Sequence, residues 1–281
     1  MSPTRPNIGV AFTGNGLRGF SNIALIEFFE EINFKPHMVV GCGAGSFIAA
    51  LWGQGLNSQT IIKIIEEELK PNLLSHIDLY GFISFIKSPF GAYKKNHAIL
   101  KPNNIKNVYH KLFQETQLEE LSPRTLIQTT NVDNGAGVVF EKGKLKDLVY
   151  ASGSMLPFFP PVCINDEWYT DGNFSAPVPA TALIDRDMEH IISLTFTGHS
   201  FAHPRSFLSF YSNFVNLAFS KVQRSQIALA IELHYGEILL MPVKTRMKEG
   251  AITIKEIHHF IDAGRETVRK HKEAILHLIN I

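Results

Sequence analysis

The sequence predicts an α/β protein, a three-layer α/β/α sandwich around a central, mostly parallel sheet. The first observation is that short apolar segments alternate with segments whose apolar residues recur at helical spacing. The second is that the apolar segments at residues 8–12 and 38–40 each lead into a glycine-rich turn and then into a helix. A strand–helix–strand–helix order favours parallel strands covered by helices.

The individual elements follow from the same spacing. Residues 21–32 are predicted to be helical because four apolar residues fall at positions i, i+3, i+4 and i+7. A second helix is expected over residues 43–53, and a third around 61–69, which Pro71 ends. Further on, we expect strands at 125–130, 136–140, 168–170, 191–196 and 238–241, helical spacing over 207–218, and a terminal amphipathic helix over 255–279.

Length and composition limit the classes of protein to consider. The chain has 281 residues without a repeat or linker, so we expect a single domain over residues 1–281, with a helical C-terminal part at 200–281. A net charge of +1 gives no reason to expect a nucleic-acid partner. Two cysteines suit a reducing compartment. Without a signal peptide or an apolar spanning stretch, a cytoplasmic protein is expected.

A glycine-rich loop, Gly14-Asn15-Gly16-Leu17-Arg18-Gly19, follows the first predicted strand. It satisfies the G-x-G-x-x-G pattern of dinucleotide-binding folds. That interpretation needs an acidic residue at the end of the second strand, about 20 residues further on, and the second strand ends in Val40-Gly41-Cys42. Dinucleotide binding is therefore disfavoured. A simpler alternative is a turn that only packs a helix against a strand.

The most informative position is Gly43, within Gly41-Cys42-Gly43-Ala44-Gly45. This segment lies between a predicted strand and a predicted helix, which is the context of a G-x-S-x-G nucleophile elbow. In such an elbow the tight turn projects a serine hydroxyl above the sheet. Here both outer glycines are present, and glycine stands in the place of the serine.

Together with two later segments, the loop and the elbow resemble the patatin-like phospholipases. One is Asp171-Gly172-Asn173, after the strand at 168–170. The other runs over residues 151–162 and is similar to the family's A-S-x-x-x-P-x-x-F-P-P segment. Residues 176–179 (Ala-Pro-Val-Pro) are also similar, and the resemblance covers roughly residues 7–195. The family usually has glycine or alanine where this chain has Asn173.

The resemblance implies hydrolysis of acyl esters in phospholipids or lysophospholipids by a serine–aspartate dyad, through an acyl-enzyme and without a metal or organic cofactor. It implies that Asp171 is the general base, that Gly43 occupies the nucleophile position, and that Gly41 and Gly45 shape the elbow. Arg18 would hold the loop or contact a phosphate head group, or else form a local ion pair at the surface. The implied oxyanion hole comprises Gly14, Asn15, Gly16, Leu17 and Arg18.

Gly43 leaves two interpretations open. An engineered removal of the nucleophile from an active lipase is favoured, because the rest of the site matches the family. The alternative is a natural non-catalytic relative that binds lipid or acts as a scaffold. Ser46 and Cys42 are poor substitutes, since Ser46 lies too far into the helix and Cys42 precedes the turn. On this basis Gly43→Ser alone is expected to produce esterase activity.

Residues 72–105 form a separate feature, possessing many aromatic and apolar residues near lysines. We expect a lid here, with residues 73–95 as a mobile cover over the site that contacts membranes peripherally. The alternative is that these side chains cap the core of an insertion. The adjacent His258-His259, and His271 and His277 six residues apart, lack the i, i+4 spacing of a helical zinc pair, so no metal is expected. The oligomeric state does not follow from the sequence.

Overall fold

The computed structural model describes residues 6–14, 16–69, 94–197, 207–245 and 253–279. Within these residues, eight strands form one sheet in the order β5-β6-β3-β2-β1-β7-β8, with β4 paired to β3. Strands β3, β2, β1, β7 and β8 run parallel to one another. The others join antiparallel at the β3 side. The strands are β1 (Ile8–Phe12), β2 (Met38–Cys42), β3 (Arg124–Asn131), β4 (Gly137–Phe140), β5 (Val162–Ile164), β6 (Glu167–Asp171), β7 (His190–Thr197) and β8 (Glu237–Lys244).

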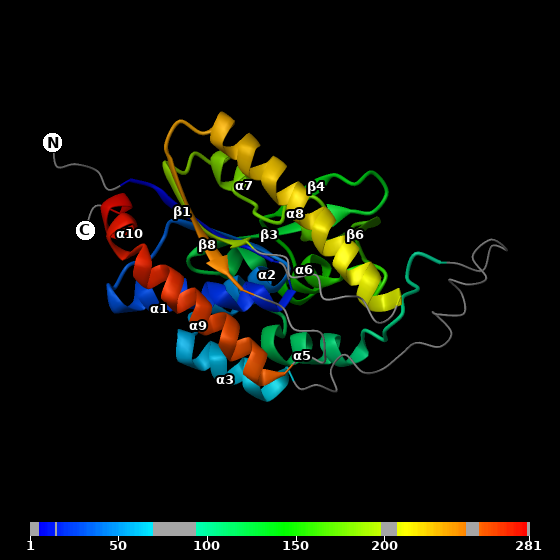
Figure 1. Cartoon of the computed structure of the whole chain (residues 1–281). Coiled ribbons are helices and arrows are strands. Elements are labelled where there is room, and N and C mark those ends of the chain that lie inside the picture. The colour runs from blue at the N-terminus through cyan, green and yellow to red at the C-terminus, as the bar shows by residue number, and fades with distance from the viewer. Residues whose placement is uncertain (1–5, 15, 70–93, 198–206, 246–252, 280–281) are drawn as a thin grey trace.

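Helices cover both faces of this sheet (Figure 1). One face carries α1, α2, α3, α5, α6 and α9, and the other carries α7 and α8. The predicted three-layer α/β/α sandwich with a mostly parallel sheet is therefore confirmed. The α-helices are α1 (Ile23–Glu31), α2 (Ala44–Gly53), α3 (Ser58–Glu68), α5 (Asn103–Phe113), α6 (Leu145–Gly153), α7 (Thr181–Ile184), α8 (Phe207–Leu233), α9 (Ile254–Lys270) and α10 (Lys272–Leu278).

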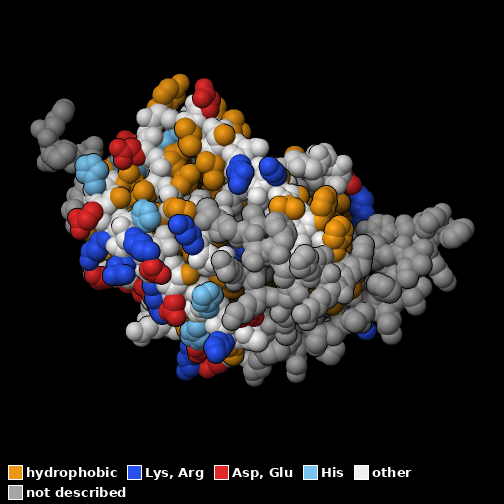
Figure 2. Space-filling model, in the orientation of Figure 1, with side chains coloured by type: hydrophobic (Ala, Val, Ile, Leu, Met, Phe, Trp, Pro, Cys, Tyr) orange, Lys and Arg blue, Asp and Glu red, His pale blue; other side chains and the backbone are white. Residues whose placement is uncertain are grey.

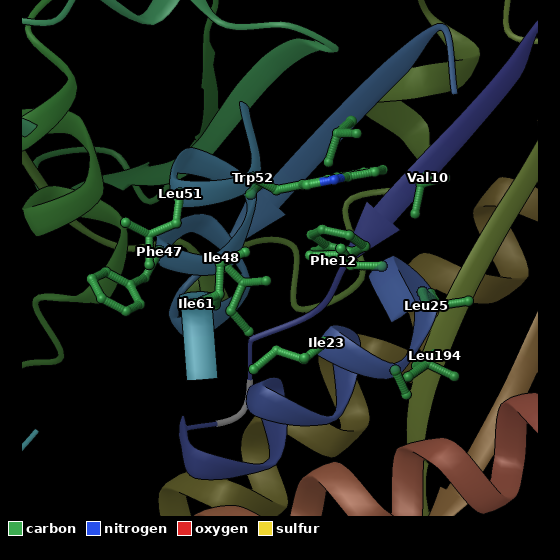
Figure 3. Packing of buried hydrophobic residues seen from close by; sticks show 14 of the residues in the cluster. Val10, Phe12, Ile23, Leu25, Phe47, Ile48, Leu51, Trp52, Ile61 and Leu194 are labelled. Carbon is green, nitrogen blue, oxygen red and sulfur yellow. The ribbon is translucent and has the colours of Figure 1, made fainter. Parts of the chain in front are cut away.

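Strand β1 shows how the apolar pattern supplies both layers. Ile8, Val10 and Phe12 belong to the larger buried cluster, which β1 shares with α1, α2 and α3. Ala11 points to the opposite face and joins a smaller cluster that includes Leu183 of α7. Successive strand residues face opposite sides of a sheet, so a fully apolar strand is suited to burial on both faces. Figure 3 shows how tightly the larger cluster fills the space between β1 and the helices.

Several predicted elements differ from the observed ones. The helix expected over 21–32 is preceded by a 3₁₀ helix, η1 (Gly16–Asn22), and its regular part begins only at Ile23. The single terminal helix expected over 255–279 is wrong, because α9 and α10 are separated at His271. Helices α5 and α6 were not predicted. Both have apolar residues at helical spacing, so the signal was present in the sequence and was missed.

Two expectations concern membranes. The lid predicted at 72–105 falls largely on residues 70–93, which lie outside the described residues. In the part of the chain that the structure does describe, no helix combines the length and the apolar character needed to cross a bilayer.

Candidate active site

Gly43 occupies the sharp turn between β2 and α2. Its backbone has φ 54° and ψ −125°, and it is the N-cap residue of α2. A positive φ suits glycine, whereas a residue with a Cβ pays a strain of about 1–3 kcal/mol in such a conformation. The turn therefore has the strand–turn–helix geometry that the sequence predicts for an elbow, held here by the one residue that adopts it without strain.

The outer glycines of the elbow are required by close packing. A Cβ on Gly45 would overlap the backbone carbonyl of Phe12 in β1, and a Cβ on Gly41 would lie 2.5 Å from the Cα of Ser46. Both contacts are with backbone atoms, which cannot move aside as a flexible side chain can. These two glycines thus allow the first turn of α2 to lie directly against β1 and β2.

Ser152 of α6 holds the turn in place. The backbone N–H of Gly43 donates to Ser152 Oγ at 3.0 Å, and Ser152 Oγ donates to the carbonyl of Gln128 in β3 at 2.7 Å. All three groups are buried. Sequence reasoning missed this role, although Ser152 lies in the segment at 151–162 that resembles the family.

Asp171 ends β6, opposite Thr129 of β3, and its exposed fraction is only 6%. A Cβ placed on Gly43 would lie 3.6 Å from Asp171 Oδ1, so the structure brings the two predicted dyad positions together. Burial raises the pKa of the Asp171 carboxyl to about 6, against the opposing effect of hydrogen bonds from Asn173. The group is therefore mostly ionised at neutral pH, the state that a general base needs.

Asn173 occupies the space between the elbow and the carboxylate. Its backbone N–H and its Nδ2 donate to Asp171 Oδ1 at 2.8 and 2.7 Å. Nδ2 also lies 2.8 Å from the place of a Cβ on Gly43, and the amide group lies 2.5 Å from the place of a Cβ on Gly14. Asn173 is 2% exposed. Its amide would therefore have to shift to accommodate a Cβ at Gly43.

The glycine loop borders the same space. The Cα of Gly14 lies 3.3 Å from the place of a Cβ on Gly43, which brings the start of the predicted oxyanion hole next to the elbow. Gly16 has φ +60° and opens η1, with its Cβ direction free of neighbours within 4 Å. Asn15 lies outside the described residues.

The other two loop residues turn inward. Leu17 packs against the larger core cluster. Arg18 is 4% exposed, so the alternative that places Arg18 at the surface is wrong. Burial lowers the pKa of its guanidinium. That Arg18 holds the loop or contacts a phosphate stays a prediction.

Neither substitute nucleophile is placed for catalysis. Ser46 Oγ donates to the carbonyl oxygen of Gly43 at 2.6 Å, which directs it into the first turn of α2. Cys42 is fully buried, and burial together with the negative charge of Asp171 raises the pKa of its thiol well above the usual value. A neutral thiol is a poor nucleophile. Among the described residues, no cluster of three or more histidine, cysteine or acidic side chains could hold a metal ion.

The raised pKa of Asp171 predicts a pH-dependent effect of Asp171→Asn. The folded-state pKa of about 6 lies above the usual 3.8, so the carboxyl stabilises the fold when protonated and loses that contribution as pH rises through 6. An asparagine keeps an oxygen for both Asn173 donors and does not titrate. Between pH 5 and pH 8 the variant should therefore gain about 1.4 kcal/mol in unfolding free energy relative to the unsubstituted protein.

Thermal melts of both proteins across this pH range would measure the effect. Subtracting the two curves cancels every other titrating group, and Tm of the variant should rise by a few degrees relative to the unsubstituted protein. A Tm difference that stays constant from pH 5 to pH 8 would contradict the raised pKa. Loss of a cooperative transition would instead identify Asp171 as a carboxylate needed for folding.

Comparisons with known proteins point to one family. The family model described as "Patatin-like phospholipase" matches residues 10–184, more than half of the chain. The chain is 22% identical to lysophospholipase NTE1 of Candida albicans over 187 residues, which are 66% of this chain and 13% of that protein. It is 27% identical to patatin-like phospholipase domain-containing protein 6 of Homo sapiens over 180 residues, 63% of this chain and 12% of that protein.

Two solved structures are also similar. VipD from Legionella pneumophila has a TM-score of 0.48 at 11% identity, over 97% of this chain and 67% of that chain. The type III effector ExoU has a TM-score of 0.42 at 13% identity, over 97% of this chain and 54% of that chain. The chain spans only about an eighth of the length of the curated relatives named above. On the extent of the family match and the order of its motifs, this chain belongs to the patatin-like phospholipase family.

Proposed function

We propose that this chain is a lipid-binding member of the family that, with glycine at position 43, does not hydrolyse acyl esters. The observation that carries the proposal is the Asn173 amide, which lies between Gly43, Asp171 and Gly14. Loss of a hydroxyl alone would leave a space at Gly43. Here the Asn173 amide nitrogen lies 2.8 Å from the place of a Cβ on Gly43, and it donates to the carboxylate that would otherwise accept the serine proton.

The ligand class follows from the family and from the groups that border the site. A phospholipid or lysophospholipid would present an acyl carbonyl to the backbone N–H groups of the loop that begins at Gly14, and Arg18 would hold that loop. Donors of this kind, held in place before the ligand arrives, bind an ester oxygen whether or not a nucleophile follows. No metal or organic cofactor is part of the proposal.

A second candidate remains, in which Gly43 replaces the serine of an otherwise active lipase. The positive φ of Gly43 and the short distance to Asp171 favour it, because both suit a serine–aspartate dyad. Asn173 opposes it, since a side chain at Gly43 would meet Nδ2 at 2.8 Å. The codon at position 43 of the parent gene separates the two: a serine codon would support the lipase, and a glycine codon the lipid-binding protein.

The proposal predicts binding without turnover. The protein should retain a fluorescent lysophospholipid in equilibrium dialysis, release no fatty acid from it, and gain no mass from a fluorophosphonate reagent that labels active serine hydrolases. Intact-mass spectrometry and a fatty-acid assay on the same incubation provide both readouts. Fatty acid released above the buffer background would overturn the non-hydrolytic part of the proposal, and absence of retention would overturn the lipid-binding part.

A further inference from the structure

Helix α8 is apolar on two opposite faces. Its inward face buries Val215, Phe219, Gln223 and Ala230 at the intervals of a helical stripe. Every large apolar side chain that is exposed among the described residues lies on α8 or just after it: Phe210, Phe214, Leu217, Leu229, Ile231, Leu233 and Tyr235. Of these, Phe210, Phe214 and Leu217 follow one another along the outward face. Scattered exposed apolar residues are ordinary, but a concentration of this kind marks a surface that another body covers.

The charges on α8 differ between its two ends. Lys221 and Arg224 are exposed on the outward face, one and two turns beyond Leu217, and the helix has no acidic residue before Glu232. The far end is acidic, with Glu232 and then Glu237 exposed. Figure 2 shows hydrophobic side chains along this side of the molecule, with lysine or arginine side chains between them. Apolar residues beside basic ones are typical of a segment that binds an anionic lipid surface.

The basic and aromatic end of α8 is also the end that borders the candidate active site. Phe219 packs edge-on against Phe174, with ring centroids 5.0 Å apart, and Phe174 directly follows Asn173. Tyr211 packs against Phe158 with a centroid distance of 6.4 Å. The outward face above these contacts therefore lies beside the site, whereas the acidic end lies away from it.

We propose that the outward face of the first two thirds of α8, comprising Phe210, Phe214, Leu217, Lys221 and Arg224, docks on a lipid surface that contains anionic head groups. The rings enter the boundary between head groups and acyl chains, and the two cations contact the phosphates. The acidic far end stays away from the membrane, which tilts the helix and turns the candidate site toward the lipid. This surface lies outside the site, so the proposal holds whether or not the site hydrolyses esters.

The test is co-sedimentation of the full chain with phosphatidylcholine vesicles that contain either no phosphatidylglycerol or about one third of it. The unsubstituted protein should bind the anionic vesicles more tightly. Phe210→Ser with Phe214→Ser should weaken that binding by about tenfold or more, because two aromatic contacts are lost. Lys221→Glu with Arg224→Glu should remove the preference for anionic vesicles.

Matched controls lie on the same chain. Leu229→Ser with Ile231→Ser removes two exposed apolar residues from the far end of the same helix, and Lys63→Glu with Lys270→Glu makes the same change in net charge on exposed lysines of α3 and α9. Both controls should bind like the unsubstituted protein, and a thermal melt of each variant verifies that it is folded. Binding that is absent, or equally weak in folded controls and test variants, would overturn the proposal.

A further outcome would assign the outward face of α8 to a dimer interface instead of a lipid surface. If the unsubstituted protein is a dimer in sedimentation, does not bind vesicles, and becomes a monomer on Phe210→Ser with Phe214→Ser, then a second copy of this chain covers α8 and the lipid assignment is wrong. Since these measurements do not depend on ester hydrolysis, they remain informative if the site proves to be active.

Discussion

The combination of Gly43→Ser with Asn173→Ala is expected to raise esterase activity on a short-chain nitrophenyl ester at least about a thousandfold, because loss of a nucleophile costs on the order of a millionfold in a comparable enzyme. Gly43→Ser alone should raise it far less. The Cβ that it adds would lie 2.8 Å from Asn173 Nδ2, which already donates to Asp171. Alanine at position 173 frees both the space and the carboxylate, and it keeps the backbone donor.

The pH profile of the double variant provides an independent check. The side-chain hydrogen bond from Asn173 favours the ionised carboxylate, so its removal should raise the pKa of Asp171 above about 6. Activity should accordingly increase with pH through a midpoint above 6. The first control is Asn173→Ala alone, which still lacks a nucleophile and should be inactive. The second adds Asp171→Asn to the double variant and should abolish its activity.

These variants separate the two interpretations of Gly43. If Gly43→Ser alone is fully active, Asn173 moves aside at little cost and the engineered-lipase interpretation gains support. If the folded double variant neither hydrolyses esters nor reacts with a fluorophosphonate, then the elbow and Asp171 do not form a working dyad. The prediction that positions 43 and 171 are those of a serine–aspartate dyad would then be wrong.

The largest effect on stability is expected from Gly45→Ala. The added Cβ would overlap the backbone carbonyl of Phe12, so α2 would have to move away from β1 at a point where neither backbone is flexible. Overpacking of this kind costs about 3 kcal/mol or more. Tm should fall by roughly 10 °C, as measured by scanning calorimetry.

Gly153→Ala is the matched control for this experiment. Gly153 is also helical, at the end of α6, but no atom lies within 4 Å of the place of its Cβ. Replacing glycine by alanine in an unstrained helical position stabilises a protein by about 0.4–1 kcal/mol. Tm should therefore stay constant or rise slightly. An equal fall in Tm for both variants would show that the cost arises from helix geometry rather than from the contact with Phe12.

Much of the parallel half of the fold could be predicted because its strands are continuous apolar segments. Strands such as β1 and β7 are buried on both faces, so their mainly apolar composition is itself the signal that predicts them. Helices α5 and α6 could also have been predicted, because each has apolar residues at helical spacing: Ile105, Val108, Tyr109, Leu112 and Phe113 in α5, and Leu145, Leu148 and Val149 in α6. The break at His271 depends on how α9 and α10 each pack on the protein, which local spacing does not encode.

The site shows the same division. Gly43 and Asp171 could be predicted as neighbours, since the motifs that carry them occur together in one family. The position of the Asn173 side chain could not, because it depends on how closely the elbow approaches Asp171 in three dimensions rather than on any local pattern. Asn173 was visible in the sequence only as a departure from the usual glycine or alanine. Only the structure shows that the Asn173 amide lies beside both Gly43 and the Asp171 carboxylate.

The close contacts of Gly41 and Gly45 also affect how related sequences are best interpreted. These glycines are required by the way α2 lies on the sheet, and a protein without catalysis needs that packing as much as an enzyme does. The residue between them has a positive φ that favours glycine, so only catalysis, which needs its hydroxyl, gives a reason to keep a serine there. A lineage can therefore lose its activity while the flanking glycines persist. The two glycines then indicate only that a relative shares this fold. The residues at positions 43 and 173 indicate whether that relative can still hydrolyse a substrate.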